Sequence, residues 1–170
     1  MGTYKLITIY GTKNNDLLKG TANNDTIYGD SGNDTIDTGS GNDIVIYKGE
    51  GNDTITFGAG NDVIWASSGK DTLNGGDGED VLFGGKGIDT LIGGKGADTF
   101  EFEKASGNDV IKDYNKIDGD LLRFYIQSGD EKTLKVKSSN SVEWGSLSIE
   151  LENTYITKLD DLNFEFITVI

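Results

Sequence analysis

The chain has 170 residues, among them 25 glycines, and it contains no proline, cysteine or histidine. Without cysteine it has neither disulfides nor a zinc site built from thiolates, and without histidine it lacks the commonest general base and transition-metal ligand. The 29 acidic and 15 basic residues give a net charge of −14. This charge argues against nucleic acid and anionic membranes as partners, and in favour of a cation.

The N-terminal segment 1–10, "MGTYKLITIY", carries a short stretch of alternating apolar residues. We expect it to form a lead-in strand rather than a signal peptide, because it lacks an apolar core followed by a cleavage site. No apolar run approaches the length of a membrane span, so we expect no membrane-spanning segment.

From residue 11 onward an aspartate recurs every nine residues, with a single interval of ten before Asp53. Two residues after each of these aspartates stands one aliphatic or aromatic residue, from Leu18 to Phe100. The ten repeat aspartates are Asp16, Asp25, Asp34, Asp43, Asp53, Asp62, Asp71, Asp80, Asp89 and Asp98. Asp109, followed by Ile111, adds an eleventh copy at an interval of eleven.

Each repeat predicts a short strand with one inward side chain, preceded by a six-residue turn in which Gly or Asn takes the positions that need positive φ. Two repeats make one coil with a strand on each side. Odd and even repeats then stack into two parallel sheets. Residues 11–101 are therefore predicted to form an all-β domain, a right-handed parallel β-roll of about five 18-residue coils.

Stacking places the aspartates of alternate repeats in two columns, one on each edge of the roll. The interior is too thin to stabilise the fold, and without a cation the aspartates within each column repel one another. Carboxylates of successive loops, with main-chain carbonyls left accessible by glycine, supply the oxygen ligands that Ca²⁺ accepts. We expect up to about eight Ca²⁺ ions in the roll, with folding coupled to binding. The glycines of the candidate sites are Gly76, Gly78, Gly85, Gly87, Gly94 and Gly96.

Three nonapeptides carry a family resemblance: "GGDGEDVLF", "GGKGIDTLI" and "GGKGADTFE". They resemble the G-G-x-G-x-D-x-apolar-x repeat of the RTX family of secreted bacterial proteins. The resemblance extends over about residues 11–114 and implies a Ca²⁺-binding β-roll in a secreted or cell-surface protein. The N-terminal copies depart from the pattern, with Asn14 and Asn23 in place of the fourth-position glycine, and weaker calcium sites are expected there.

The two faces of the roll differ in their outward side chains. The odd sheet presents threonines, which suit a strand surface; an ice-binding array is a weaker alternative, because the loops carry residues such as Lys13 and Ala22. The even sheet presents an apolar face that includes Val63, Trp65 and Phe83. We expect residues from about 120 onward to fold across this face and bury Trp65, while a neighbouring domain, a partner or self-association is the alternative.

The C-terminal region 102–170 is expected to cap the roll with strands and to carry a possible secretion signal. Its segment "FEFEKASGNDVIKDYNKIDGD" resembles the closing segment of RTX proteins, in which Asp109, Asp113, Asp118 and Asp120 could complete one more calcium site. Segments such as "SVEW" and "SLSIELE" predict antiparallel strands. The tail "LDDLNFEFITVI" resembles the uncleaved signal of type I secretion substrates, which implies the type I machinery as a partner; a plain final strand is the alternative.

The sequence therefore predicts a non-enzymatic calcium-binding module that folds outside the cell. The competing hypothesis is a polysaccharide-binding accessory module, because "GADTF" and "DVIKDY" also resemble the regulatory modules of mannuronan epimerases. Its candidate footprint is the basic group Arg123, Lys132, Lys135 and Lys137. An adhesin or surface-lattice module is a third hypothesis. Catalysis is not expected, since the repeat carboxylates are committed to metal.

Overall fold

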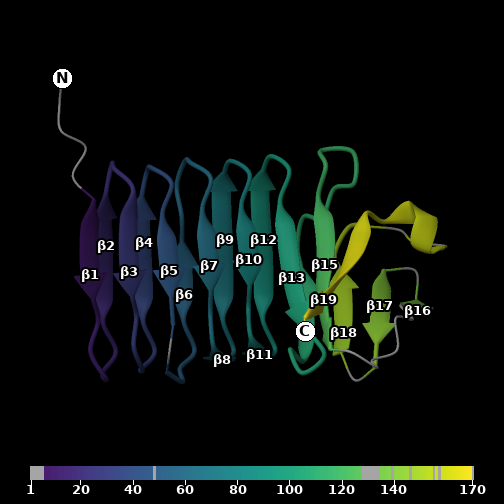
Figure 1. The fold of residues 1–170 in the computed structure, drawn as a ribbon, viewed down its shortest axis with the longest axis horizontal. Helices are drawn as coiled ribbons and strands as arrows, with labels where there is room; N and C mark the ends of the chain where they lie inside the picture. The colour runs from purple at the N-terminus through teal and green to yellow at the C-terminus, as the bar shows by residue number, and fades with distance from the viewer. Residues whose placement is uncertain are drawn as a thin grey trace.

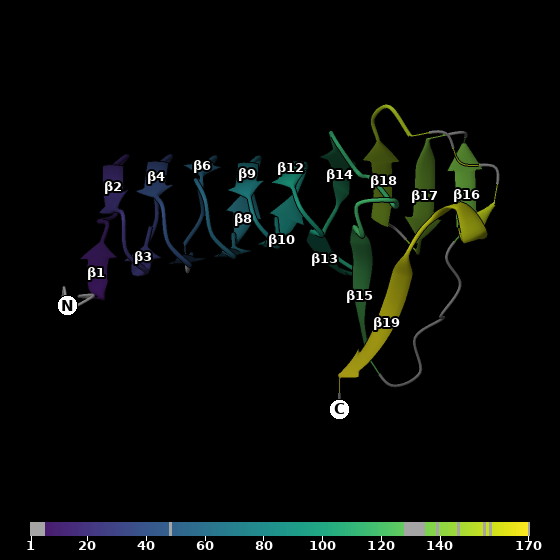
Figure 2. The ribbon, with the colours of Figure 1, turned by 90° about the horizontal axis from the view of Figure 1, so that it is seen from above.

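The computed structural model describes residues 6–47, 49–127, 135–138, 140–145, 147–154, 156 and 158–169. Their strands stack side by side along one axis, in order of sequence from residue 6 to Ile111 (Figure 1). Seen from above, the stack consists of two facing rows of strands joined by short turns (Figure 2). This arrangement confirms the predicted parallel β-roll.

Strands from alternate repeats form two long sheets. The first sheet contains β1 (Ile7–Tyr10), β3 (Asp25–Tyr28), β5 (Ile44–Ile46), β7 (Val63–Trp65), β10 (Val81–Phe83), β13 (Thr99–Glu103), β15 (Leu121–Gln127) and β19 (Phe164–Val169), in that order and all parallel. The second contains β2 (Leu17–Thr21), β4 (Thr35–Gly39), β6 (Thr54–Thr56), β9 (Thr72–Asp77), β12 (Thr90–Lys95), β14 (Asn108–Ile111), β18 (Leu147–Leu151), β17 (Ser141–Trp144) and β16 (Lys135–Ser138). Short strands β8 (Ser68–Gly69) and β11 (Lys86–Gly87) pair with each other, and Leu159–Asp161 form one 3-10 turn, η1.

The strand register aligns the inward residues of every repeat. Leu82 of β10 pairs with Ile64 on one side and with Phe100 on the other. The inward residues predicted from the repeat are all buried except Leu18, which is partly buried because no strand of the second sheet precedes β2. One side chain per strand therefore fills the interior, as expected for a chain with this spacing.

The C-terminal strands extend the roll instead of covering its side. β15 and β19 continue the first sheet beside β13, and β18 continues the second sheet beside β14, so that the two sheets contain seven successive pairs of parallel strands. The expected antiparallel pairing holds for β16, β17 and β18, whereas β19 is parallel to β15. The open edges of β13 and β14 offer unpaired main-chain groups, which the following strands satisfy.

The prediction that the C-terminal region buries Trp65 is therefore wrong. The Trp65 side chain remains 43% exposed on the outer face of β7. The region instead continues the core of the roll, and there Phe124 lies 5.7 Å from Phe102 and 5.7 Å from Trp144 between ring centroids. Within the described residues no helix has the length and apolarity needed to cross a membrane.

Candidate metal centre

The repeat aspartates lie in two hydrogen-bonded columns along the two edges of the roll. In each column the main-chain N–H of one aspartate donates to the Oδ1 atom of the aspartate one coil further on, at 2.7 to 3.0 Å. The first column is Asp16, Asp34, Asp53, Asp71, Asp89 and Asp109, and the second is Asp25, Asp43, Asp62, Asp80, Asp98 and Asp120. The stacking predicted from the spacing is confirmed.

The columns continue beyond the repeat at different places. Asp109 ends the first column, whereas Asp120 ends the second, so these two carboxylates lie on opposite edges. Asp113 accepts hydrogen bonds from the main-chain N–H groups of Gly93 and Gly94, and Asp118 accepts one from the Asn115 amide. Of the four carboxylates expected to share one terminal site, Asp109 therefore lies apart, because the turn after Ile111 carries the chain to the other edge. Asp113 and Asp118 are electrostatic neighbours of Asp120 on the second edge.

The second oxygen of most column aspartates has no protein partner. This Oδ2 atom is buried without a hydrogen bond in Asp34, Asp43, Asp62, Asp71, Asp80, Asp89 and Asp98. A buried carboxylate oxygen without a donor is costly, and a cation or a proton would satisfy it.

The first two loops solve the same problem with threonine. The Oδ2 atom of Asp16 accepts hydrogen bonds from the Thr12 N–H at 2.6 Å and from its hydroxyl at 2.9 Å. Thr21 donates to Asp25 in the same way, at 2.7 and 2.9 Å. The Oδ2 atoms of these two aspartates therefore have less need of a cation than those further along the roll, whereas Asp25 Oδ1 remains buried without a partner.

The glycine at the first position of each consensus loop has no side chain, so its own aspartate and a carbonyl group of the next coil can approach it closely. A Cβ atom added at Gly75 would collide with Asp80 Oδ2 and would lie 2.6 Å from the carbonyl oxygen of Gly93 in the next coil. Carboxylate and main-chain carbonyl oxygens therefore approach the same small volume. The six candidate glycines at the second and fourth positions have φ between +87° and +151°, which explains why glycine is required there.

Burial raises the pKa of the column carboxyl groups. Desolvation is the largest cause, and neighbouring carboxylates of the same column add to it. The pKa rises to about 7 for Asp62, Asp71, Asp89, Asp98 and Asp109, and to about 6 for Asp53 and Asp80. Near neutral pH and without a cation, the fold therefore disfavours the charged form of these two columns of carboxyl groups.

The donor set fits a hard cation. It consists of oxygen atoms only, from carboxylates and main-chain carbonyls, which is the chemistry that Ca²⁺ prefers. Among the described residues no three Asp or Glu side chains gather around one point, so each site would rely on column carboxylates together with main-chain oxygens. The repeat residues present are therefore compatible with calcium between successive loops.

Two further hydrogen-bonded rows in the loops were not predicted from the sequence. Asn residues that precede the aspartates stack as a third and fourth row, in which Asn33 N–H donates to Asn15 Oδ1 and Asn42 N–H donates to Asn24 Oδ1, both at 2.9 Å. The signal was present, because "ND" recurs at the same loop position from Asn15 to Asn61. These asparagines lie on the surface beside the buried aspartates.

The basic group proposed as a glycan footprint is only partly described. Arg123 is already paired, since its guanidinium donates to Glu101 Oε1 at 2.9 Å and also to Glu165. Lys132 lies outside the described residues, as do the side chains of Lys135 and Lys137. Arg123 therefore contributes to the joining of β13, β15 and β19.

Stacked, buried aspartates at both edges of a parallel β-roll, each ending a glycine-rich loop, define a class of calcium-binding repeat modules. The RTX calcium-binding nonapeptide repeat matches residues 10–45, 47–82 and 74–103, which is more than half of the chain. The chain belongs to this family.

Two further comparisons concern whole proteins. No curated protein sequence gives a significant match to the chain. Among solved structures, the crystal structure of the extracellular lipase LipA from Serratia marcescens is similar, with a TM-score of 0.48 and 17% sequence identity, over 93% of this chain and 40% of the lipase chain. The chain thus spans less than half of the length of this lipase.

Proposed function

We propose that this chain is a calcium-binding module whose folding is coupled to Ca²⁺ binding outside the cell. The observation that carries the proposal is the set of buried Asp Oδ2 atoms without partners, arranged in two columns of like charge. A divalent cation between successive loops would satisfy these oxygens and cancel the repulsion within each column.

The proposed ligands are the column carboxylates and the carbonyl groups of the loops between them. Six aspartates on each edge leave five gaps on that edge, counting Asp109 and Asp120 as the last members. The loops with Gly76, Gly78, Gly85, Gly87, Gly94 and Gly96 keep to the consensus and are expected to hold the ions most tightly. Asp113, which binds two main-chain N–H groups, is assigned a structural role in place of the ligand role expected from sequence.

Coupling to folding follows from the thin interior. One apolar side chain per strand is little apolar burial to offset the conformational entropy lost when the nine residues of its repeat become ordered. Far-UV circular dichroism during a calcium titration tests the proposal. We expect a cooperative gain of β signal, with Mg²⁺ a poor substitute; a full β spectrum in excess chelator would overturn the coupling.

The same coupling would suit export. Proteins with RTX repeats are typically secreted by type I systems. In this proposal the chain stays unfolded in the low-calcium cytoplasm and folds in millimolar external calcium, with the tail around Phe164–Val169 read by the exporter. Deletion of residues 159–170 should abolish export from a host with a type I exporter, whereas export of the deletion variant at the wild-type level would contradict this role.

A polysaccharide-binding module is the second candidate function, and one surface favours it. Tyr10, Tyr28, Ile46, Trp65 and Phe83 are adjacent across five strands of the first sheet, and Tyr10 stacks on Tyr28 at 5.1 Å. Exposed aromatic rows of this kind can stack on sugar rings. Calcium-dependent binding on a glycan array that is lost in Trp65→Ala would support this function, and no binding would remove it.

A further inference from the structure

The first position of each loop decides how much space remains beside the aspartate columns. On the first edge the strand register aligns five residues of successive coils at this position: Gly11, Gly29, Tyr47, Ala66 and Gly84. Tyr47 lies six residues before its aspartate, and the other four lie five before theirs, because the interval that ends at Asp53 has ten residues. A Cβ atom added at Gly11 would lie against the carbonyl oxygen of Gly29, one coil further on, and 3.2 Å from Asp16 Oδ2. Added atoms at Gly20 and Gly75 meet the same two kinds of oxygen, so this volume is the proposed cation site between coils.

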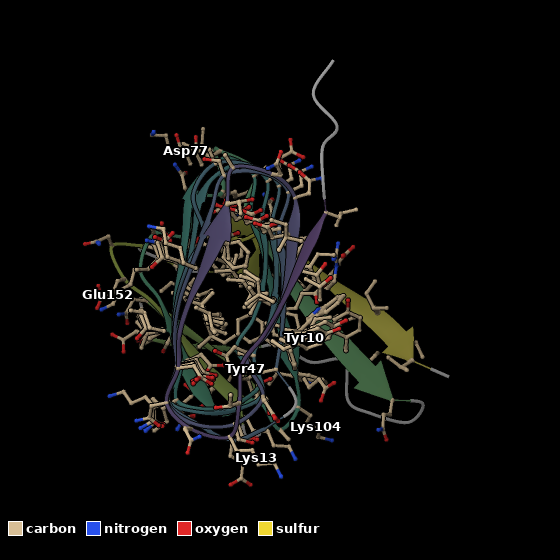
Figure 3. All side chains as sticks on the ribbon, turned by 90° about the vertical axis from the view of Figure 1, so that its left-hand side faces the viewer. Tyr10, Lys13, Tyr47, Asp77, Lys104 and Glu152 are labelled. Carbon is tan, nitrogen blue, oxygen red and sulfur yellow. The ribbon has the colours of Figure 1, made fainter. Side chains whose placement is uncertain are left out.

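At Gly29 the equivalent volume is already filled. A Cβ atom added there would meet the Cε1, Cζ and Cδ1 atoms of the Tyr47 ring, and no oxygen atom is nearer. The Tyr47 side chain is only 7% exposed and packs in the apolar core. In the view along the roll axis, Tyr47 lies within the outline of the roll, toward the edge that carries Lys13 (Figure 3).

The ring stands among the carboxylates of the first column. The Tyr47 hydroxyl group and Asp34 Oδ2 are both buried without a hydrogen bond of normal geometry. The electrostatic neighbours of this hydroxyl group are Asp53, Asp34 and Asp71. An uncharged phenol with one O–H donor therefore occupies the gap between the loops that end at Asp34 and Asp53.

We propose that Tyr47 takes the place of a calcium ion in this gap and removes one site from the first column. The inference rests on the proposed function, since it concerns where calcium does not bind. A small rotation of the phenol lets its hydroxyl donate to Asp34, which satisfies that carboxylate without metal. The column is thereby divided into a short block at Asp16–Asp34 and a longer block from Asp53 to Asp109.

The count of bound ions tests the inference directly. Native mass spectrometry of the full chain in calcium gives the number of ions for the wild type, for Tyr47→Gly and for Tyr47→Phe. We expect one more ion in Tyr47→Gly, because glycine restores the open volume seen at Gly75, and no change in Tyr47→Phe, because the ring still fills it. Circular dichroism in calcium establishes that each variant is folded.

A substitution that introduces tyrosine at a glycine position, and is therefore expected to remove an ion, serves as the matched control. Gly93 follows Gly75 in the second column as Tyr47 follows Gly29 in the first, and neither Gly75 nor Gly93 has a positive φ. Gly93→Tyr should therefore lose one ion. If Tyr47→Gly does not fold, this variant decides: one ion fewer supports the inference, and an unchanged count overturns it.

The outcomes separate the inference from the proposed function. A wild-type chain that binds no calcium overturns the proposed function. A wild-type chain that binds calcium, together with a folded Tyr47→Gly variant of unchanged count, overturns the inference alone. A changed count in Tyr47→Phe overturns it as well, because the hydroxyl would then be acting as a ligand.

Discussion

The first and second halves of the roll differ in the hydrogen bonds of their loops, and only the first two loops satisfy the Oδ2 atoms of their aspartates with protein donors. In residues 11–61 the loops carry asparagine rows, and the first two loops add threonine donors to Asp16 and Asp25. In residues 75–98 the asparagine position is taken by Glu79, Ile88 and Ala97, and the loops keep the consensus glycines. Protein hydrogen bonds and, in the proposed function, a bound cation are thus alternative ways to satisfy these oxygens.

Calcium removal should affect the two halves unequally, and this is the largest effect expected. In excess chelator the amides of residues 75–98 should lose their protection from hydrogen exchange, because their aspartates have no threonine donors and their loops have no asparagine rows. The amides of residues 11–45 should retain part of theirs. Hydrogen exchange read by mass spectrometry resolves the halves, and equal protection in both would break the comparison.

The next effect concerns single carboxylates. Asp80 lies between Asp62 and Asp98 in its column, so Asp80→Ala removes an oxygen from two gaps. Loss of a supporting group outside the ligand shell typically costs about 10–100-fold in metal affinity, and loss of a ligand should cost at least as much.

Asp16→Ala is the matched comparison, since Asp16 is the first member of its column, borders a single gap, and already accepts hydrogen bonds from Thr12. Its effect should be smaller by about tenfold or more. Calorimetric titration of both variants checks the order, and equal losses of calcium affinity would contradict the assignment of sites.

The pH dependence should change sign with calcium. Burial raises the pKa of Asp71 and Asp98 to about 7, above the value near 4 of an unfolded chain, so the metal-free fold binds more protons than the unfolded state. The free energy of unfolding without metal should therefore fall as the pH rises from about 4 to about 7. In calcium, protons compete with the ion, and the apparent affinity should weaken as the pH falls.

Far-UV circular dichroism in chelator at about pH 5 and about pH 8 measures the first trend as the β content of the metal-free chain. Calcium titration at the same two pH values measures the second. A proton release on calcium addition near pH 6.5 gives an independent check. A metal-free fold that is more stable at the higher pH would show that the column carboxylates are not protonated at the lower one.

The smallest effect belongs to the asparagine rows. Asn42 Oδ1 accepts a hydrogen bond from the Asn61 N–H at 3.0 Å, and Asn42→Ala should lower the free energy of unfolding in calcium by about 1 kcal/mol. Glu79→Ala, at the same loop position, is the control, because no main-chain N–H of the described residues bonds to its carboxylate. Chemical denaturation measures the free energy of unfolding of both variants. A similar loss of stability in Glu79→Ala would show that the asparagine row does not stabilise the fold.

The parts of the molecule that repeat could be predicted from sequence, and the parts that occur once could not. Recurring spacing placed Ile64, Leu82 and Phe100 in one buried row, and Asp62 beside Asp80. The C-terminal strands alternate in the same way whether they cover a face or extend an edge, so their pattern did not distinguish the two. The direction of the Tyr47 ring depends on the open volume at Gly29 in another coil, which no local pattern reveals.

The cluster around Arg123 sets the length of the apolar strip on the first sheet. Along the row Tyr10, Tyr28, Ile46, Trp65 and Phe83, the next two positions are Glu101 and Arg123, which are ion-paired to each other. At the usual strand spacing the five side chains span about 19 Å. A ligand that lies flat on this strip therefore meets the charged pair at one end. The pair limits the length of ligand that can make apolar contacts along the whole strip.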